Sequence, residues 1–136
     1  TRAAAPHLKK QGGAIVNVAS VAARKGIPPG SEGSSGPYAV AKAGVMGLTR
    51  QLALELGPFG VRVNCVAPGV VASGRLKRVF EITKQDHGPE GPLATIPMGR
   101  VGTVDECAAL IVALCTDDTS YMTGVTVDVN GASYVA

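Results

Sequence analysis

The residues whose spacing most directly suggests chemistry are Tyr38 and Lys42, which lie four positions apart. Residues at i and i+4 share one face of a helix, so the two side chains would be neighbours. A phenol has a reference pKa of about 10, and a nearby ammonium group favours the phenolate, so the pair could exchange a proton with an alcohol or carbonyl. A hydroxyl from Ser20 could orient and polarise the substrate oxygen. Taken alone, Tyr-x-x-x-Lys is weak, because any aromatic ring and solvated charge on one helix face match it.

Helices and strands alternate in the predicted order α-β-α-β-α-β, which indicates βαβ units, a parallel sheet and right-handed crossovers. Ligands on such sheets bind outside the carboxyl ends of the strands. Three features fall at those ends: Ser20, the helix start at Tyr38, and Pro68-Gly69. The predicted elements are the end of a helix at 1–10, a strand at 14–19, a helix at 38–56, a strand at 61–69, a helix that Thr103 opens in a capping box with Glu106, and a strand at 124–129.

The 38–56 helix has two predicted stripes. Its inner face would be Ala41, Val45, Leu48, Leu52 and Leu56, and the second stripe is the small residues Ala39, Ala43 and Gly47. Glycine costs about 1 kcal/mol in a helix interior, so Gly44 and Gly47 need a reason such as the close approach of another helix. That helix could belong to a second subunit, or the stripe could pack within the chain.

Composition narrows the possible functions of this 136-residue chain. It is 46% hydrophobic and 17% charged with a net charge of +3, which is typical of one globular domain and gives no strong case for nucleic acid. The basic cluster Arg75-Leu76-Lys77-Arg78 is interpreted as a solvated helix face. No apolar run reaches the roughly 18 residues of a membrane helix, so no membrane partner is expected. Three cysteines without a metal-binding pattern predict no metal and buried, reduced thiols in a cytoplasmic protein.

These motifs extend over nearly the whole chain. The run "GGAIVNVASVAA…PYAVAKAGVMGLTRQLALELGPFGVRVNCVAPGVVAS…PMGRVG" and the later "TGVTVDVNGA" resemble the C-terminal half of a short-chain dehydrogenase/reductase, and are similar to 3-oxoacyl-carrier-protein reductases. The resemblance implies hydride transfer between NAD or NADP and a small carbonyl or secondary alcohol. Ser20 would orient the substrate, Tyr38 would be the general acid/base, and Lys42 would lower the tyrosine pKa and hydrogen-bond the nicotinamide ribose.

The resemblance also assigns residues to the cofactor. Pro68, Gly69, Val70 and Val71 would line the nicotinamide, and the Ser73 hydroxyl would hold its carboxamide. Asn64 would be structural. Residues 70–100 are expected to form a lid, and the full-length protein is expected to be a homodimer or homotetramer.

The sequence departs from the family pattern because it has no Gly-rich phosphate turn. Its three strands would be the last three of seven in a Rossmann-like doubly wound parallel sheet. Residues 1–136 would then be the C-terminal catalytic part of a single domain whose N-terminal cofactor half is absent. Such a chain is expected to bind NAD(P) poorly and to be inactive by itself. A non-catalytic module that uses this fold for binding or assembly is the alternative.

Overall fold

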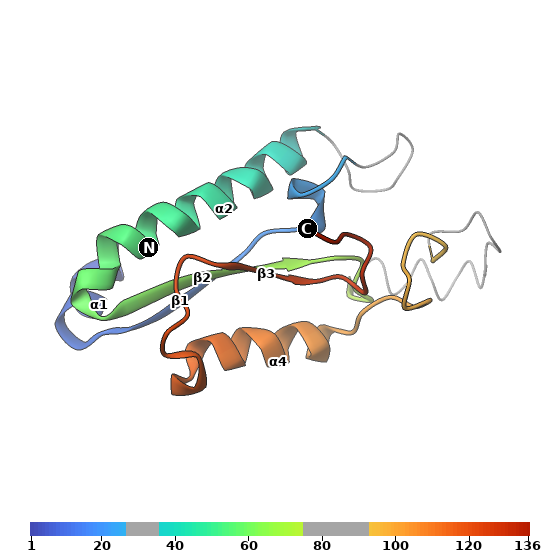
Figure 1. Cartoon of the computed structure of the whole chain (residues 1–136). Helices are drawn as coiled ribbons and strands as arrows, with labels where there is room; N and C mark the ends of the chain where they lie inside the picture. The colour runs from blue at the N-terminus through green and yellow to red at the C-terminus, as the bar shows by residue number, and fades with distance from the viewer. Residues whose placement is uncertain (27–35, 75–92) are drawn as a thin grey trace.

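The chain forms three layers, with a parallel sheet between two long helices (Figure 1). The computed structural model describes residues 1–26, 36–74 and 93–136. Both pairs of neighbouring strands are parallel, in the order β1-β2-β3. The strands are β1 (Gly13–Val18), β2 (Val61–Pro68) and β3 (Thr126–Val129). This arrangement confirms the predicted α/β fold with three parallel strands.

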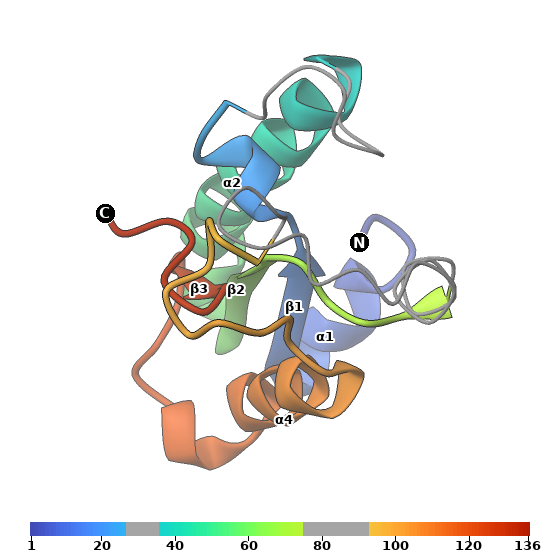
Figure 2. The same cartoon turned by 90° about the vertical axis from the view of Figure 1, so that its right-hand side faces the viewer.

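The helices cover opposite faces of the sheet, as Figure 2 shows from the side. The α-helices are α1 (Ala5–Gln11), α2 (Gly36–Leu56) and α4 (Val104–Cys115). The short 3-10 turns are η1 (Val21–Ala23), η2 (Gly57–Phe59) and η4 (Asp117–Thr119). After α2, η2 ends at Gly60, whose φ of 69° is left-handed and favours glycine.

Strand β2 is the central strand, and every residue from Val63 to Ala67 is buried. Alternate side chains point to opposite faces of the sheet, and Val61, Val63 and Cys65 pack in apolar clusters with α2. From the other face, Arg62 donates to the carbonyls of Leu114 (2.9 Å) and Thr116 (3.0 Å) at the end of α4. Strand β2 therefore contacts α2 on one face and α4 on the other.

Asn64 is the buried polar residue of β2. Its Nδ2 donates to the carbonyl of Met122 (2.7 Å), and its Oδ1 accepts from the backbone N–H of Val125 (3.3 Å). Because both partners lie in the segment that leads into β3, Asn64 ties the two strands together. This geometry agrees with the structural role expected for it.

The buried face of α2 differs from the prediction. The buried residues are Met46, Thr49, Ala53 and Leu56. Of the predicted inner face, only Leu56 is buried, while Ala41 is exposed and Leu48 is 50% exposed. The prediction was right for Val45 and Leu52, which are partly buried and pack against the core, and for Leu56, but wrong for Ala41 and Leu48. Apolar residues occur on almost every side of this helix, and Val40 and Leu54 (73% and 76% exposed) face outward. The sequence pattern alone does not show which of its apolar sides meets the sheet.

The cysteines agree only in part with the prediction. All three cysteines are free, but only Cys65 and Cys107 are buried, so the expectation that all the thiols are buried is wrong for Cys115 at the exposed end of α4. The expected lid lies mostly outside the described residues, as do the basic cluster at 75–78 and most of the loop before α2. No helix in the described ranges is long and apolar enough to cross a membrane, and the same residues contain no cluster of metal ligands.

Candidate active site

Ser20 lies just beyond the carboxyl end of β1 and caps the η1 turn. Its backbone is extended (φ −165°, ψ 154°), and its Oγ accepts the backbone N–H of Ala22 at 3.2 Å. A serine hydroxyl has one proton to donate and two lone pairs to accept with. Because the Ser20 hydroxyl only accepts in its contacts with the described residues, its proton can be donated to a ligand at the strand end.

Helix α2 brings Lys42 to the same end of β1. The Nζ of Lys42 donates to the carbonyl of Val18 at 2.9 Å. The backbone N–H of Ala19 donates to the Val66 carbonyl in β2. The N–H and C=O of one trans peptide group point in opposite directions, so the Val18 carbonyl faces away from β2, toward the outer edge of the sheet. In the part of the chain that the structure describes, no strand pairs with that edge. Lys42 therefore satisfies a carbonyl at the open side of the strand end.

Tyr38 lies one helical turn before Lys42. The Nζ of Lys42 is 5.8 Å from the centroid of the Tyr38 ring, and the tyrosine is 39% exposed. Among the described residues, no hydrogen bond joins the Tyr38 hydroxyl to Ser20 or Lys42. Catalytic hydrogen bonds are often long without substrate and tighten when it binds. The structure thus brings Tyr38 and Lys42 together, with the Lys42 ammonium group at the strand end that leads to Ser20, while their catalytic roles stay predictions.

A partly buried pair of hydrogen bonds, which the sequence did not predict, joins α2 to β1. Asn17 donates to the Oγ1 of Thr49 at 2.9 Å, and the fully buried Thr49 donates to the carbonyl of Val45 at 2.8 Å. Thr49 lies two turns beyond Lys42 on the same face of α2, so this pair of hydrogen bonds sets how far Lys42 reaches along the strand. The available signal was an asparagine within an otherwise apolar strand.

The segment after β2 carries the residues expected to line the nicotinamide. Gly69 donates to the carbonyl of Val129 (2.9 Å), and a Cβ on Gly69 would lie 2.9 Å from Asn130, so only glycine fits without a shift. Val71 forms a parallel bridge with Gly102, which donates to the Val70 carbonyl at 2.9 Å. Pro68, Val70 and Val71 are partly exposed and Ser73 is exposed. The backbone of the segment is therefore fixed by its hydrogen bonds to Val129 and Gly102, while the side chains of Pro68, Val70, Val71 and Ser73 stay at least partly accessible.

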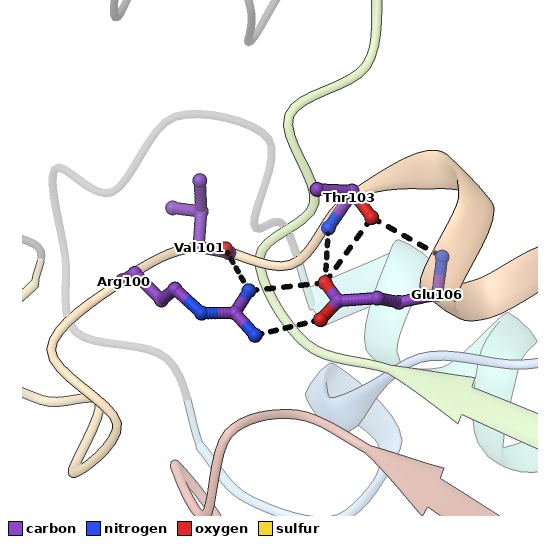
Figure 3. A network of polar contacts seen from close by, with 4 residues as sticks. All are labelled: Arg100, Val101, Thr103 and Glu106. Carbon is purple, nitrogen blue, oxygen red and sulfur yellow. Dashed lines mark hydrogen bonds and ion pairs between the residues drawn. The ribbon is translucent and has the colours of Figure 1, made fainter.

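A polar network at the start of α4 supports this segment (Figure 3). Thr103 and Glu106 form the predicted capping box, in which the Thr103 amide donates to the Glu106 carboxylate at 2.7 Å. Arg100, which the sequence reasoning missed, donates to both oxygens of that carboxylate (3.0 and 2.6 Å). Hydrogen bonds from Arg100 and then from the Thr103 amide lower the pKa of Glu106 to about 2. A cavity of about 310 Å³ lies beside this network, lined also by Val70 and Cys107.

The described residues fit one end of a nicotinamide cofactor. Lys42 offers an ammonium group, Ser73 is exposed, and hydrogen bonds with Val129 and Gly102 fix the backbone of residues 68–71. The sequence contains no Gly-rich turn that could present backbone amides to a pyrophosphate. The fit is therefore to the nicotinamide end alone.

A parallel sheet covered on both faces by helices is typical of part of a doubly wound α/β domain, and in such domains ligands bind at the carboxyl ends of the strands, where Lys42 and Ser20 lie. A protein-family model described as enoyl-(acyl carrier protein) reductase matches residues 1–132. The chain belongs to the short-chain dehydrogenase/reductase family.

Known proteins agree with this assignment. The chain is 42% identical to dehydrogenase/reductase SDR family member 4 of Bos taurus over 134 residues, which cover 98% of this chain and 45% of that protein. A crystal structure of a 3-oxoacyl-[acyl-carrier protein] reductase from Brucella melitensis superimposes with a TM-score of 0.85 at 35% identity, covering 99% of this chain and 47% of that one. The chain thus spans about half the length of the curated relatives it matches.

Several similar structures contain a nicotinamide cofactor. A 3-oxoacyl-[acyl-carrier protein] reductase from Brucella melitensis with bound NAD has a TM-score of 0.81 at 34% identity, covering 99% of this chain and 46% of that one. The protein ElxO with bound NADP has a TM-score of 0.85 at 28% identity, covering 97% and 51%. These neighbours support a nicotinamide cofactor for the family without selecting NAD or NADP.

Proposed function

We propose that this chain is the C-terminal catalytic part of an NAD(P)-dependent oxidoreductase that interconverts a carbonyl and a secondary alcohol. The observation that carries the proposal is the position of Lys42, held at 2.9 Å from the Val18 carbonyl with Tyr38 one turn earlier on α2. Ser20 follows Val18, the last residue of β1, by two positions. These positions support the proposal that Tyr38 is the proton donor, Lys42 the cation and Ser20 the orienting hydroxyl at one strand end.

The roles follow from the free donors of each group. The Ser20 hydroxyl donates to the substrate oxygen, because the η1 turn uses it only as an acceptor. Tyr38 gives its proton to the oxygen as negative charge develops there, and takes it back in the alcohol direction. An ammonium group has three donors, and within the described residues Lys42 donates one of them to Val18, so the others can serve ribose hydroxyls and water. The positive charge of Lys42 also favours the phenolate of Tyr38.

The cofactor, when bound, supplies or accepts the hydride. Residues 68–71 would shape the pocket for its nicotinamide ring, and the exposed Ser73 hydroxyl would hold the carboxamide. Because the sequence offers no phosphate turn, we expect the 136-residue chain alone to bind NAD(P)H weakly and to be inactive. A 3-oxoacyl thioester is the proposed substrate class, on the basis of the reductases that the chain resembles in sequence and structure.

The outer face of α2 supports the proposed homodimer or homotetramer. Val40, Leu48 and Leu54 are exposed there, and a Cβ added at Gly44 would meet nothing within 4 Å. An apolar face with this small residue would let a second helix approach closely. The buried free thiols Cys65 and Cys107 suit the reducing cytoplasm that the sequence analysis predicts.

The test uses the protein encoded by the complete gene, assayed for oxidation of NADH and NADPH with a 3-oxoacyl thioester and a simple ketone. We expect turnover, and a loss of about 10²–10⁴-fold in Tyr38→Phe, the usual contribution of a general acid. Tyr121→Phe is the matched control, because Tyr121 is fully exposed and should keep wild-type turnover. A protein that neither binds the nucleotides nor reduces carbonyls would instead support the non-catalytic module.

A further inference from the structure

Arg24, at the end of the η1 turn that begins at Ser20, connects this turn to strand β3. Arg24 is the C-terminal cap of η1, and its guanidinium meets the Asp128 carboxylate in β3. Nε lies 3.3 Å from Oδ1 and Nη2 lies 3.1 Å from Oδ2. Nη2 also donates to the carbonyl of Thr126 at 3.2 Å. The guanidinium therefore binds both a side chain and the backbone of a strand 104 positions further along the chain.

This ion pair is partly shielded from solvent. The side chains of Arg24 and Asp128 keep only 25% and 24% of their exposure. The guanidinium lies 5.7 Å from the ring centroid of Tyr134, and the neighbouring Lys25 donates to the carbonyl of Ser133. Two-point pairing of arginine with a carboxylate fixes direction as well as distance. The η1 turn is thus attached to β3 and to the segment that follows it.

Short backbone bonds transmit this attachment to Ser20. Within the turn, Ala23 donates to the Ser20 carbonyl (3.0 Å) and Arg24 donates to the Val21 carbonyl (2.9 Å). Ala22 donates to the Ser20 Oγ itself. Because β2 separates β1 from β3, the Arg24–Asp128 pair spans the strand end where the proposed substrate binds. A shift of the turn at Arg24 would therefore also move the Ser20 hydroxyl.

We infer that Arg24 and Asp128 are positioning residues, which act on the reaction through Ser20. The inference rests on the proposed function, in which the Ser20 hydroxyl orients the substrate. A misplacement of about 1 Å can cost about 10²-fold in rate. Loss of either partner of the pair should therefore lower kcat while the affinity for the nucleotide is kept, since neither side chain belongs to the segment expected to hold the nicotinamide.

The experiment uses the complete gene product and the variants Arg24→Met, Asp128→Asn and Arg24→Lys. We expect Arg24→Met and Asp128→Asn to lower kcat roughly 10- to 100-fold, and Arg24→Lys to recover part of that loss because it keeps the charge. In a Ser20→Ala background, Arg24→Met should cause no further loss of kcat. Arg50→Met is the control, because Arg50 is exposed on α2 and should leave kcat unchanged.

Hydrogen exchange provides a readout that does not depend on catalysis. The amides of Ala23 and Arg24 should exchange faster in Arg24→Met than in the wild type, because both donate within the turn. Unchanged exchange would overturn the attachment, and equal losses of kcat with and without Ser20 would overturn its action through Ser20. Both results leave the proposed function standing. A wild-type protein without carbonyl reduction would refute the proposed function, and with it this role in the reaction.

Discussion

Replacement of Asn64 tests how the candidate site is held together. In Asn64→Leu the shape is roughly kept, but the carbonyl of Met122 loses a donor at 2.7 Å and the amide of Val125 loses an acceptor at 3.3 Å. A buried group left without its partner costs about 1–3 kcal/mol. The short bond to Met122 should count for about 2 kcal/mol, and the longer one, on the more exposed Val125, for about 1 kcal/mol or less. We therefore expect a loss of about 2–3 kcal/mol in the free energy of unfolding.

The assay is reversible urea unfolding of the purified protein, with the slope m compared between variants so that the midpoints can be converted to free energies. Asn17→Leu is the matched control. It removes one bond, to the Oγ1 of Thr49, and that hydroxyl still donates to the carbonyl of Val45. The control should lose about 0.5–1.5 kcal/mol. If Asn64→Leu is no more destabilising than Asn17→Leu, the reasoning about Asn64 is refuted.

Two other predictions concern pH and assembly. The lowered pKa of Glu106, about 2, means that its stabilising contribution is complete above its ordinary value of 4.5 and is lost as the pH falls toward 2. The melting temperature of Glu106→Gln should therefore lie below that of the wild type at neutral pH, and the gap should close in acid; a gap independent of pH would contradict the assignment. Ala43→Leu places a large side chain on the exposed side of α2 and should weaken the oligomer of the complete protein in light scattering, whereas an unchanged mass would count against that interface.

The sequence predicts the sheet better than it predicts the packing of α2. Strand β2 is mostly apolar apart from Arg62 and Asn64 and is bounded by glycines, which is typical of a strand buried on both faces. The capping box at Thr103 is equally local, because both partners lie within four residues. The inner face of α2 was predicted only in part. Val45, Leu52 and Leu56 do pack against the core, but the helix periodicity is ambiguous, and the most buried side also includes the polar Thr49, which accepts a hydrogen bond from Asn17.

The proximity of Tyr38 and Lys42 could be predicted, because their spacing sets it on any helix. The tertiary contacts that hold the candidate site in place could not be predicted from the sequence. Arg24 and Asp128 are 104 positions apart, and nothing in either local stretch indicates that the two meet. The contact of Lys42 with Val18 likewise depends on where α2 crosses the sheet, which the partly buried hydrogen bond from Asn17 to Thr49 helps to fix. Local spacing thus identifies candidate chemistry, and tertiary contacts decide its geometry.

The central claim is that Tyr38 supplies the proton during carbonyl reduction. The most direct test is a single-turnover measurement on the complete protein, following deuterium transfer from the labelled nicotinamide to the carbonyl carbon. We predict that Tyr38→Phe slows this chemical step by about 10²–10⁴-fold while the dissociation constant of the nucleotide stays near the wild-type value. A chemical step as fast in Tyr38→Phe as in the wild type would contradict the claim.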